Sequence, residues 1–401
     1  MLALDGIKVL DLTTFPTASV AVMLLVDMGA EAIKIEQPNR RQGGDLEGAS
    51  ADDEMTRLAK AVYQFDERGK KRICLNLKMN EGREAFHRLA RTADVVIDEF
   101  RPGVTQRLGA DYMTLSAINP RVICCSVTGY GQDGPYSRLP GHDTNYISIA
   151  GILGTTGTAD GQHAIPGIPM GDFAGGAMQA TIGILLALIA REKTGRGQFV
   201  DVSMVDALAM FMLIRHGPDF FRTGREPRLG ERPALVFEAK DGGYVNIAPG
   251  EPWFWERLCR TMGLEQFIPY QRAVGTFAPD TEAMQQKRQQ ILTAFQTTFR
   301  TKTRDEWVRL LREADTCVSP VYDLREVMSD PHLAQRGAIV DVAHPNLGTF
   351  KQPGVMIKLS ETPGRIAEVP VLPGQNTEEV LRTVGYSENE IADLRKAGAI
   401  N

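Results

Sequence analysis

Apolar and polar positions predict alternating strands and helices through the first third of the chain. Residues 8–12 form a short apolar run typical of a strand, and residues 17–28 follow with a helical pattern. Pro16 suits the start of that helix and Gly29 suits its end. Residues 31–36 return to a strand pattern. A strand, a helix and a second strand within so short a stretch predict a βαβ unit, and therefore a parallel sheet.

The same alternation continues further along the chain. Residues 82–92 and 112–118 have helical patterns, and residues 94–98 and 121–126 have strand patterns. Residues 1 to 130 therefore predict a doubly wound α/β domain.

The longest apolar run covers residues 177–190. It is shorter than the roughly 20 residues that a membrane span needs, so we interpret it as a buried core helix. Composition then changes across residues 217–235, which are rich in Pro, Gly, Arg and Asp and predict a domain edge. Residues 236–330 follow with a predicted strand pair and several amphipathic helices, of which residues 253–262 and 285–299 are the clearest.

Charge and cysteine content exclude several classes of function. The 401-residue chain has a net charge of −5, which gives no field that would attract nucleic acid. Its five cysteines are few and odd in number, so we expect buried free thiols in a reducing, cytoplasmic compartment. No Cys or His spacing suggests a zinc site, and the first residues do not resemble a signal peptide.

Two phosphate-binding possibilities arise from the N-terminal region. Glu36, at the end of the second predicted strand, matches the acid that holds the ribose in dinucleotide-binding folds. However, residues 13–18 after the first strand contain no glycine, so a pyrophosphate could not approach that turn. A short basic cluster favours a phosphate site and a solvated turn about equally; it consists of Arg68, Lys70, Lys71 and Arg72.

Asp172 and His142 are the candidate catalytic residues. We expect Asp172 to cap the long apolar helix, where the helix dipole would keep its pKa low. The N–H groups of its glycine-flanked turn could then bind a substrate oxygen. His142 follows a Pro-Gly turn and is able to exchange protons near pH 7. On local pattern alone, a cap and a turn histidine explain both residues more simply, and Asp143 is expected only to cap a helix near Asn145.

Longer motifs identify the family that the chain resembles. Gly141-His142-Asp143, with Asn145 and Tyr146, and Gly171-Asp172-Phe173, with Gly175 and Gly176, resemble motifs of the α-methylacyl-CoA racemases. These enzymes form one branch of the class III coenzyme A-transferase superfamily. The resemblance covers nearly the whole chain and extends through residues 10–12, 25–36, 68–78, 98–109, 128–136, 192–198 and 373–381.

The resemblance implies one of two roles for Asp172. In the transferases, the matching aspartate attacks an acyl-CoA and passes through an anhydride to an aspartyl-CoA thioester. In the racemases it is a base, and a histidine matching His142 faces it across the substrate α-carbon. A glutamate in a Glu-Pro-x-Phe motif pairs with that histidine, and Glu251 matches it here. The racemase branch is the first expectation and a CoA-transferase the second. A non-catalytic acyl-CoA-binding protein is the third.

The resemblance also implies the ligand, the fold and the assembly. We expect no metal and no tightly bound cofactor, because coenzyme A is part of the acyl-CoA thioester substrate. We also expect no membrane partner. Residues 1–224 would begin a large CoA-binding, Rossmann-like domain, residues 225–330 would form a smaller α+β domain, and residues 331–401 would return to the large one. Two chains would form an interlocked homodimer. The residues matching CoA-binding motifs are Gln37, Leu75, Asn76, Leu77, Lys78, Glu99, Phe100, Arg101, Arg107 and Tyr146.

Overall fold

The chain forms two compact units. The computed structural model describes residues 1–38, 62–158, 161–227, 235–274, 281–366 and 368–401, together with residues 58, 60 and 229. The first unit contains Met1–Leu153, Ile165–Arg225 and His332–Asn401, and the second contains Gly154–Ala164 and Glu226–Pro331. Gly154–Ala164 thus belong to the second unit.

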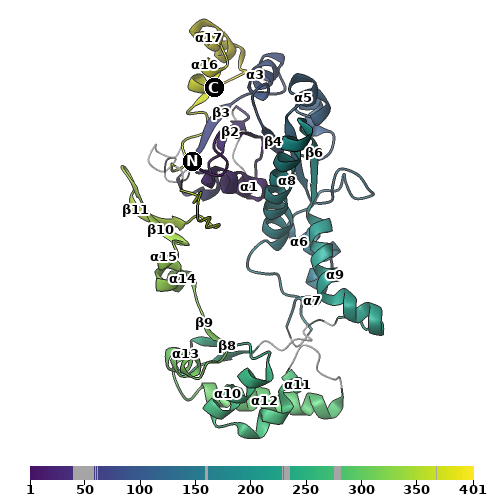
Figure 1. Cartoon of the computed structure of the whole chain (residues 1–401), viewed down its shortest axis with the longest axis vertical. Helices are drawn as coiled ribbons and strands as arrows, with labels where there is room; N and C mark the ends of the chain where they lie inside the picture. The colour runs from purple at the N-terminus through teal and green to yellow at the C-terminus, as the bar shows by residue number, and fades with distance from the viewer. Residues whose placement is uncertain are drawn as a thin grey trace, which may run out of the picture. The chain divides into compact units, whose positions relative to one another are not determined.

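A six-stranded parallel sheet forms the centre of the first unit (Figure 1). Its strand order is β3-β2-β1-β4-β5-β6, so the order reverses between β1 and β4. Leu10 of β1 lies beside Ile33 of β2 and Val96 of β4. The doubly wound α/β prediction is therefore confirmed. The strands are β1 (Lys8–Asp11), β2 (Glu31–Glu36), β3 (Lys70–Cys74), β4 (Val95–Asp98), β5 (Ile123–Thr128) and β6 (Phe199–Ser203).

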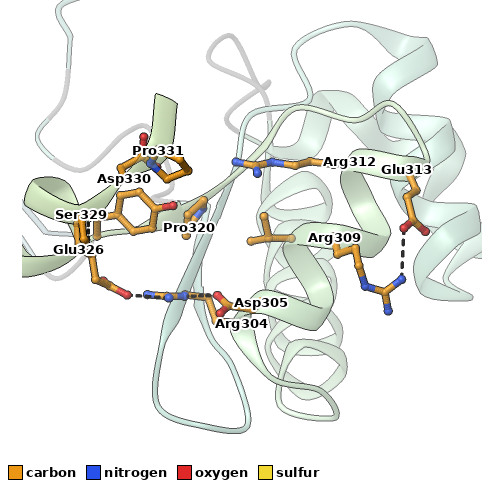
Figure 2. A pocket seen from close by; sticks show the side chains of 12 residues that line it. Arg304, Asp305, Arg309, Arg312, Glu313, Pro320, Glu326, Ser329, Asp330 and Pro331 are labelled. Carbon is orange, nitrogen blue, oxygen red and sulfur yellow. Dashed lines mark hydrogen bonds and ion pairs between the residues drawn. The ribbon is translucent and has the colours of Figure 1, made fainter. Parts of the chain in front are cut away.

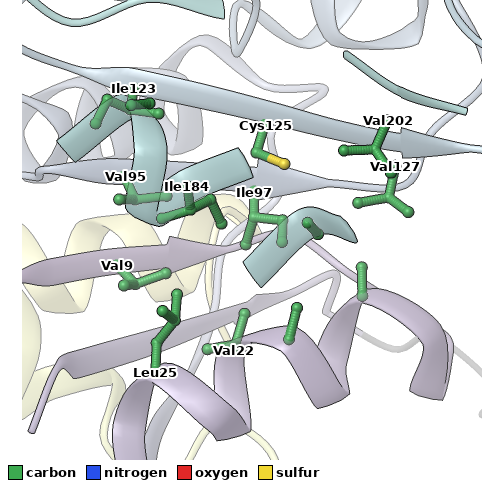
Figure 3. Close-up of a cluster of buried hydrophobic side chains, with 14 of the residues drawn as sticks. Val9, Val22, Leu25, Val95, Ile97, Ile123, Cys125, Val127, Ile184 and Val202 are labelled. Atoms are coloured by element: carbon green, nitrogen blue, oxygen red, sulfur yellow. The ribbon is translucent and has the colours of Figure 1, made fainter. Parts of the chain in front are cut away.

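Helices cover both faces of this sheet because successive strand residues point to opposite sides. Val9 belongs to one hydrophobic core and Leu10 to the other. The first core, drawn in Figure 3, packs against α1 (Pro16–Asp27), α6 (Asp143–Ile149), α8 (Met178–Thr194) and α9 (Met204–Thr223). The second core packs against α3 (Asn80–Ala90), α5 (Tyr112–Ile118), α16 (Thr377–Thr383) and α17 (Glu388–Ala397).

Helix α8 is longer than its sequence pattern predicts. A π-helical segment, η2 (Gly171–Ala177), joins it and makes one helical stretch of 24 residues, within which an 18-residue window has a mean hydropathy of 1.8. That stretch is long and apolar enough to cross a membrane, so its length does not exclude a span. Its packing supports a core helix instead. Ala180, Ile184 and Ala187 are buried in the first core, and α8 contacts β5, β6 and α1.

Three of the four cations of the basic cluster in residues 68–72 are buried in ion pairs, and the fourth, Lys71, is exposed. Lys70 and Arg72 lie on β3, and both are buried with Arg68. Lys70 Nζ lies 2.9 Å from Asp11 Oδ2, and Arg72 Nη2 lies 2.5 Å from Glu36 Oε1. Arg68 pairs with Asp27. Each buried cation therefore has a carboxylate partner, which is the condition for burying a charge.

The second unit has an antiparallel sheet in the order β7-β8-β9. The strand pair and the two clearest helices predicted from the sequence are confirmed as β7, β8, α10 and α12. Trp255, Phe295 and Phe299 fill the core between sheet and helices. The elements are β7 (Val236–Glu238), β8 (Tyr244–Ile247), β9 (Val318–Val321), α10 (Pro252–Met262), η3 (Glu265–Tyr270), α11 (Gln271–Val274), α12 (Glu282–Phe299) and α13 (Arg304–Glu313).

Shorter elements complete the described chain. All five cysteines are free thiols, and four of them are buried, as predicted. Strands β10 and β11 form an antiparallel hairpin. These elements are η1 (Phe65–Glu67), α4 (Val104–Leu108), α7 (Ile152–Thr155), α14 (Leu324–Ser329), α15 (Pro331–Gln335), β10 (Ile339–His344) and β11 (Gly348–Pro353).

Candidate active site

Asp172 lies in the π-helical segment η2 and is not an N-cap residue. Met170, the residue before the segment, already has helical angles of φ −67° and ψ −38°. Such segments are rare and are often found at functional sites. Two glycines let neighbouring helices approach closely. A Cβ on Gly176 would lie 2.5 Å from Thr17 Cγ2 of α1, and one on Gly175 would lie 2.9 Å from the Met204 carbonyl of α9.

Asp143 fixes the backbone that carries Asp172. Its Oδ1 accepts hydrogen bonds from the N–H of Gly171 at 2.5 Å and from the N–H of Asp172 at 3.2 Å. The N–H of Phe173 donates to the Pro169 carbonyl at 3.1 Å. The sequence suggests that N–H groups of this turn could bind a substrate oxygen, but the amides of Gly171, Asp172 and Phe173 already have acceptors within the chain. The sequence also predicts that Asp143 only caps a helix, so it misses this contact with the backbone of Gly171 and Asp172.

The pKa of Asp172 is raised above the ordinary aspartate value, whereas the sequence predicts a low one. Partial burial is the main cause, because desolvation disfavours the charged carboxylate. The negative charge of Asp143 raises the pKa further. A hydrogen bond from the Thr17 side chain and the nearby His142 act in the opposite direction. The carboxylate therefore binds a proton more readily than an exposed aspartate does.

His142 occupies the N-cap position of α6, next to the same site. Its backbone N–H donates to Asn145 Oδ1 at 3.0 Å, and its carbonyl accepts from the Asn145 N–H at 2.8 Å. The Phe15 ring stands edge-on to the imidazole, with ring centroids 6.5 Å apart. Because His142 also acts electrostatically on Asp172, the structure brings together the two residues that the sequence singles out.

Tyr146 supports the backbone that precedes His142. Its hydroxyl donates to the Gly141 carbonyl at 2.5 Å, and its ring packs against Gly129 and Gly141. A Cβ on Gly141 would lie 2.6 Å from Tyr146 Cε1. Burial raises the pKa of the phenol to about 12. The side chain is therefore a neutral part of the core, next to the site.

Glu99 holds the turn between β1 and α1. Its Oε1 accepts from the N–H groups of Thr14 and Phe15, and from the Thr14 hydroxyl at 2.9 Å. Glu99 directly follows β4, and Thr14 follows β1, so these bonds span the point where the strand order reverses. Ligands of open α/β sheets bind at this point, beyond the carboxyl ends of the strands. The Glu99 carboxylate, which the sequence predicts to bind CoA, thus already accepts hydrogen bonds from the turn.

The other CoA-binding candidates follow the carboxyl ends of β2, β3 and β4. Leu75 and Leu77 are buried in the second core, so they shape the loop. Asn76 and Phe100 are half-buried. The candidates with exposed polar side chains are Gln37, Lys78, Arg101 and Arg107. Their contact with coenzyme A stays a prediction.

Glu251 lies in the second unit, where it is the N-cap residue of α10. Its side chain is exposed and makes no capping hydrogen bond. Its partnership with His142 therefore stays a prediction. The same unit contains a pocket of about 490 Å³ between α13, β9 and α14 (Figure 2). Charges of both signs line this pocket and pair with one another, as Arg304 does with Asp305 and Glu326.

Comparison with known proteins agrees with the sequence motifs. The family model for CoA-transferase family III matches residues 4–377. The chain is 29% identical to the α-methylacyl-CoA racemase of Homo sapiens, over 98% of this chain and 96% of that protein. It is also 29% identical to a formyl-CoA:oxalate CoA-transferase of Rhodopseudomonas palustris, over 100% and 97%. A CAIB/BAIF family protein from Brucella suis matches the structure with a TM-score of 0.78 and 26% identity, over 96% of this chain and 99% of that one.

Proposed function

We propose, since the chain belongs to CoA-transferase family III, that it is an enzyme that inverts the α-carbon of 2-methylacyl-CoA thioesters. The observation that carries the proposal is the shared site of Asp172 and His142, which is held together by Asp143, the residue after His142, through its hydrogen bonds to the N–H groups of Gly171 and Asp172. A carboxylate alone suffices for acyl transfer. Proton exchange at two faces of one carbon needs two groups, and this site has them.

In the proposed reaction, one group removes the α-proton and the other returns a proton on the opposite face. The C–H bond breaks and its electron pair moves into the thioester, which becomes an enolate. Asp172 takes or gives the proton through its carboxylate, and His142 does so through its ring. Desolvation strengthens the carboxylate as a base, because its raised pKa lies nearer the working pH. The enolate oxygen needs donors other than the amides of residues 171–173, which are already bonded.

Deuterium exchange tests this proposal. A 2-methylacyl-CoA incubated with the enzyme in D₂O should incorporate deuterium at the α-carbon, as followed by NMR. His142→Ala and Asp172→Asn should each slow exchange about 10²–10⁴-fold, the usual contribution of a general acid or base. Thr181→Val, which removes a hydroxyl on α8 that is bonded to the Ala177 carbonyl, is the folded control. If α-deuterium exchange continues in both His142→Ala and Asp172→Asn, these two residues do not act as the acid and base.

A CoA-transferase is the second candidate function. It is favoured by the match to the formyl-CoA:oxalate enzyme, which equals the racemase match in identity. Asp172 would then attack the thioester carbonyl and expel the CoA thiolate, which gives a mixed anhydride. The thiolate would next attack the Asp172 carbonyl of that anhydride, so that the donor acid leaves as its carboxylate and an aspartyl-CoA thioester remains. Hydroxylamine or borohydride should trap that species, and peptide mass spectrometry would locate it. Loss of trapping in Asp172→Asn, with trapping retained in His142→Ala, would support transfer over racemisation.

Both candidate functions share an assembly and a ligand. We propose that two chains form an interlocked homodimer in which Glu251 of one chain approaches the His142 of the other. A carboxylate there would orient the imidazole and raise its pKa. Exposed apolar side chains on α8 and α9 support an interface; they are Ile182, Leu186, Ile189, Met210, Leu213 and Ile214. The proposed substrate brings its own coenzyme A, so the proposed reaction requires no further cofactor. An acyl-CoA-binding protein without activity would show neither exchange nor trapping.

A further inference from the structure

The turn between β1 and α1 contacts the candidate site through Phe15. Its ring stands edge-on to the His142 imidazole, with an interplanar angle of 80° and ring centroids 6.5 Å apart. Paired aromatic rings prefer this arrangement, at centroid distances of about 4.5–7 Å. We propose that Glu99 is a positioning residue whose carboxylate holds the turn and thereby fixes the Phe15 ring beside His142. The proposal rests on the proposed catalytic role of His142.

Glu99 holds the turn through a single oxygen. Its Oε1 accepts from the N–H groups of Thr14 and Phe15, and from the Thr14 hydroxyl at 2.9 Å. Hydrogen bonds to a charged acceptor are stronger than those between neutral groups. One of the three donors is the backbone of Phe15 itself, so the position of the carboxylate sets the position of the residue that carries the ring.

The Phe15 ring depends on its backbone because core packing does not hold it. The residue is 57% exposed, and it precedes Pro16, the first residue of α1. On the other side of the turn, Thr13 donates to Asp11 Oδ1 through its N–H at 2.8 Å and its hydroxyl at 2.6 Å. The bonds from Glu99 therefore act on the short segment between two fixed points.

Glu99 is itself fixed to the parallel sheet. It directly follows Asp98, the buried last residue of β4. Asp98 Oδ2 accepts from the Ser126 hydroxyl of β5 at 2.6 Å, and Asp98 Oδ1 accepts from the Phe100 N–H at 3.0 Å. These bonds hold both chain neighbours of Glu99. A supporting residue positions a functional group well when it is locked in this way by a rigid element.

Positioning and CoA binding by Glu99 predict different kinetics. A carboxylate repels the phosphates of coenzyme A, and Oε1 of Glu99 already has three donors. If Glu99 contacted the substrate in its ground state, its loss would raise KM and leave kcat unchanged. A residue that acts by placing His142 affects mainly kcat.

Ring-current shifts of His142 test the proposal without relying on activity. The full chain is labelled with [¹³C]histidine, and the His142 signal is assigned by its absence in His142→Gln. Phe15→Leu gives the chemical shift of His142 without the aromatic ring. Glu99→Ala should move the signal toward that position. Glu99→Gln should keep the wild-type signal, because its amide oxygen can accept the same three bonds.

Asp111→Ala is the matched control. Asp111 also accepts from a backbone N–H and a threonine hydroxyl, both of Thr114, but it does so at the start of α5, in the layer of the second core. Its loss should leave the His142 signal in place.

Kinetics of α-deuterium exchange test whether Glu99 acts through Phe15. Glu99→Ala should lower kcat about 10–100-fold with little change in KM, since a misplacement of roughly 1 Å has effects of this size. In Phe15→Leu, the same substitution should have little further effect, because the ring that it displaces is gone. Additive effects of the two substitutions, or a raised KM with unchanged kcat, overturn the proposal.

The remaining outcomes are equally decisive. An unchanged His142 signal in Glu99→Ala, or an equal change in Asp111→Ala, also overturns the proposal. Should Glu99→Ala not fold, Glu99→Asp withdraws the carboxylate by one methylene and gives the same comparison. If the wild type shows neither exchange nor trapping, the proposed function fails, while the His142 signals still decide whether Glu99 holds Phe15 beside the imidazole.

Discussion

The Asp172 carboxylate is subject to influences of opposite sign. Burial and Asp143 raise its pKa, and the Thr17 hydroxyl and His142 lower it. A base needs a pKa close to the working pH, yet it must also be charged often enough to accept a proton. The neighbouring residues therefore all adjust the pKa of Asp172, and the effect of each can be tested by its own substitution.

Asp143→Asn should lower the pKa of Asp172. The amide keeps an oxygen that can accept from the N–H groups of Gly171 and Asp172, but it removes the negative charge. Asp172 then loses its proton at lower pH, so the acidic limb of kcat/KM moves to lower pH. Pre-steady-state or steady-state pH profiles measure this shift. Asp201→Asn, at a carboxylate that does not act on Asp172, should leave the limb in place; an upward shift in Asp143→Asn would refute the expectation.

The sequence predicts His142 and Asp172 but not the residues that support them. Both lie in motifs that can be recognised along the chain. Asp143, in contrast, acts on amides 28 and 29 residues away, and Glu99 acts on a turn 84 and 85 residues away. No local pattern indicates such partners, because they meet only after the sheet has formed. The raised pKa of Asp172 follows from burial and from the charge of Asp143.

Among the secondary-structure elements, β3 shows what an apolar pattern misses. β1, β2, β4 and β5 are predicted because they are apolar. β3 contains Lys70 and Arg72, which are buried beside carboxylates from other strands and loops. Charge pairing takes the place of apolar side chains there. Similarly, the helical pattern predicts α8 but not η2. The glycines of η2 are needed for its close packing against Thr17 and Met204, which the sequence pattern does not indicate.

Breaking the buried ion pair of Arg68, which lies between η1 and β3, should destabilise the first unit far more than breaking an exposed pair. Arg68→Ala leaves Asp27 buried without its partner and removes the bond to the Pro353 carbonyl, with an expected loss of about 3–5 kcal/mol in unfolding free energy. Lys71→Ala breaks an exposed pair with Glu379, worth about 0–1 kcal/mol. Urea denaturation followed by circular dichroism compares them. Equal losses would contradict the expected effect of burial.

At the scale of the whole molecule, α8 and α9 expose apolar side chains on their outer side, which is typical of an interface. Leu213 and Ile214 are 59% and 68% exposed, which is unusual for neighbouring large apolar residues. The proposed homodimer would bury them. The parallel sheet follows from sequence patterns, but the apolar outer side of these helices can be recognised only once the helices are packed.

A charge placed on this surface should separate the chains. We expect the wild type to elute at twice the chain mass of 44.1 kDa in size-exclusion chromatography with light scattering. Leu213→Glu combined with Ile214→Glu should elute at the single-chain mass, because a buried interface does not tolerate unpaired charges. Met113→Glu changes an exposed apolar residue on α5, which packs on the opposite face of the sheet, and should stay dimeric. A monomeric wild type would exclude the dimer.

The second hydrophobic core has a consequence for how the chain is made. α16 and α17 complete it with Val380, Leu381, Ile391 and Leu394, and Ala399 and Ile400 are buried there as well. Residues of the first unit up to Arg225 leave the ribosome before any of these. At a synthesis rate of about 5–20 residues per second, the part of this core that α16 and α17 cover stays uncovered for on the order of 10–30 s, although α3 and α5 are already present. During that time it is exposed to chaperones, and folding of the first unit must finish after the second unit has been synthesised.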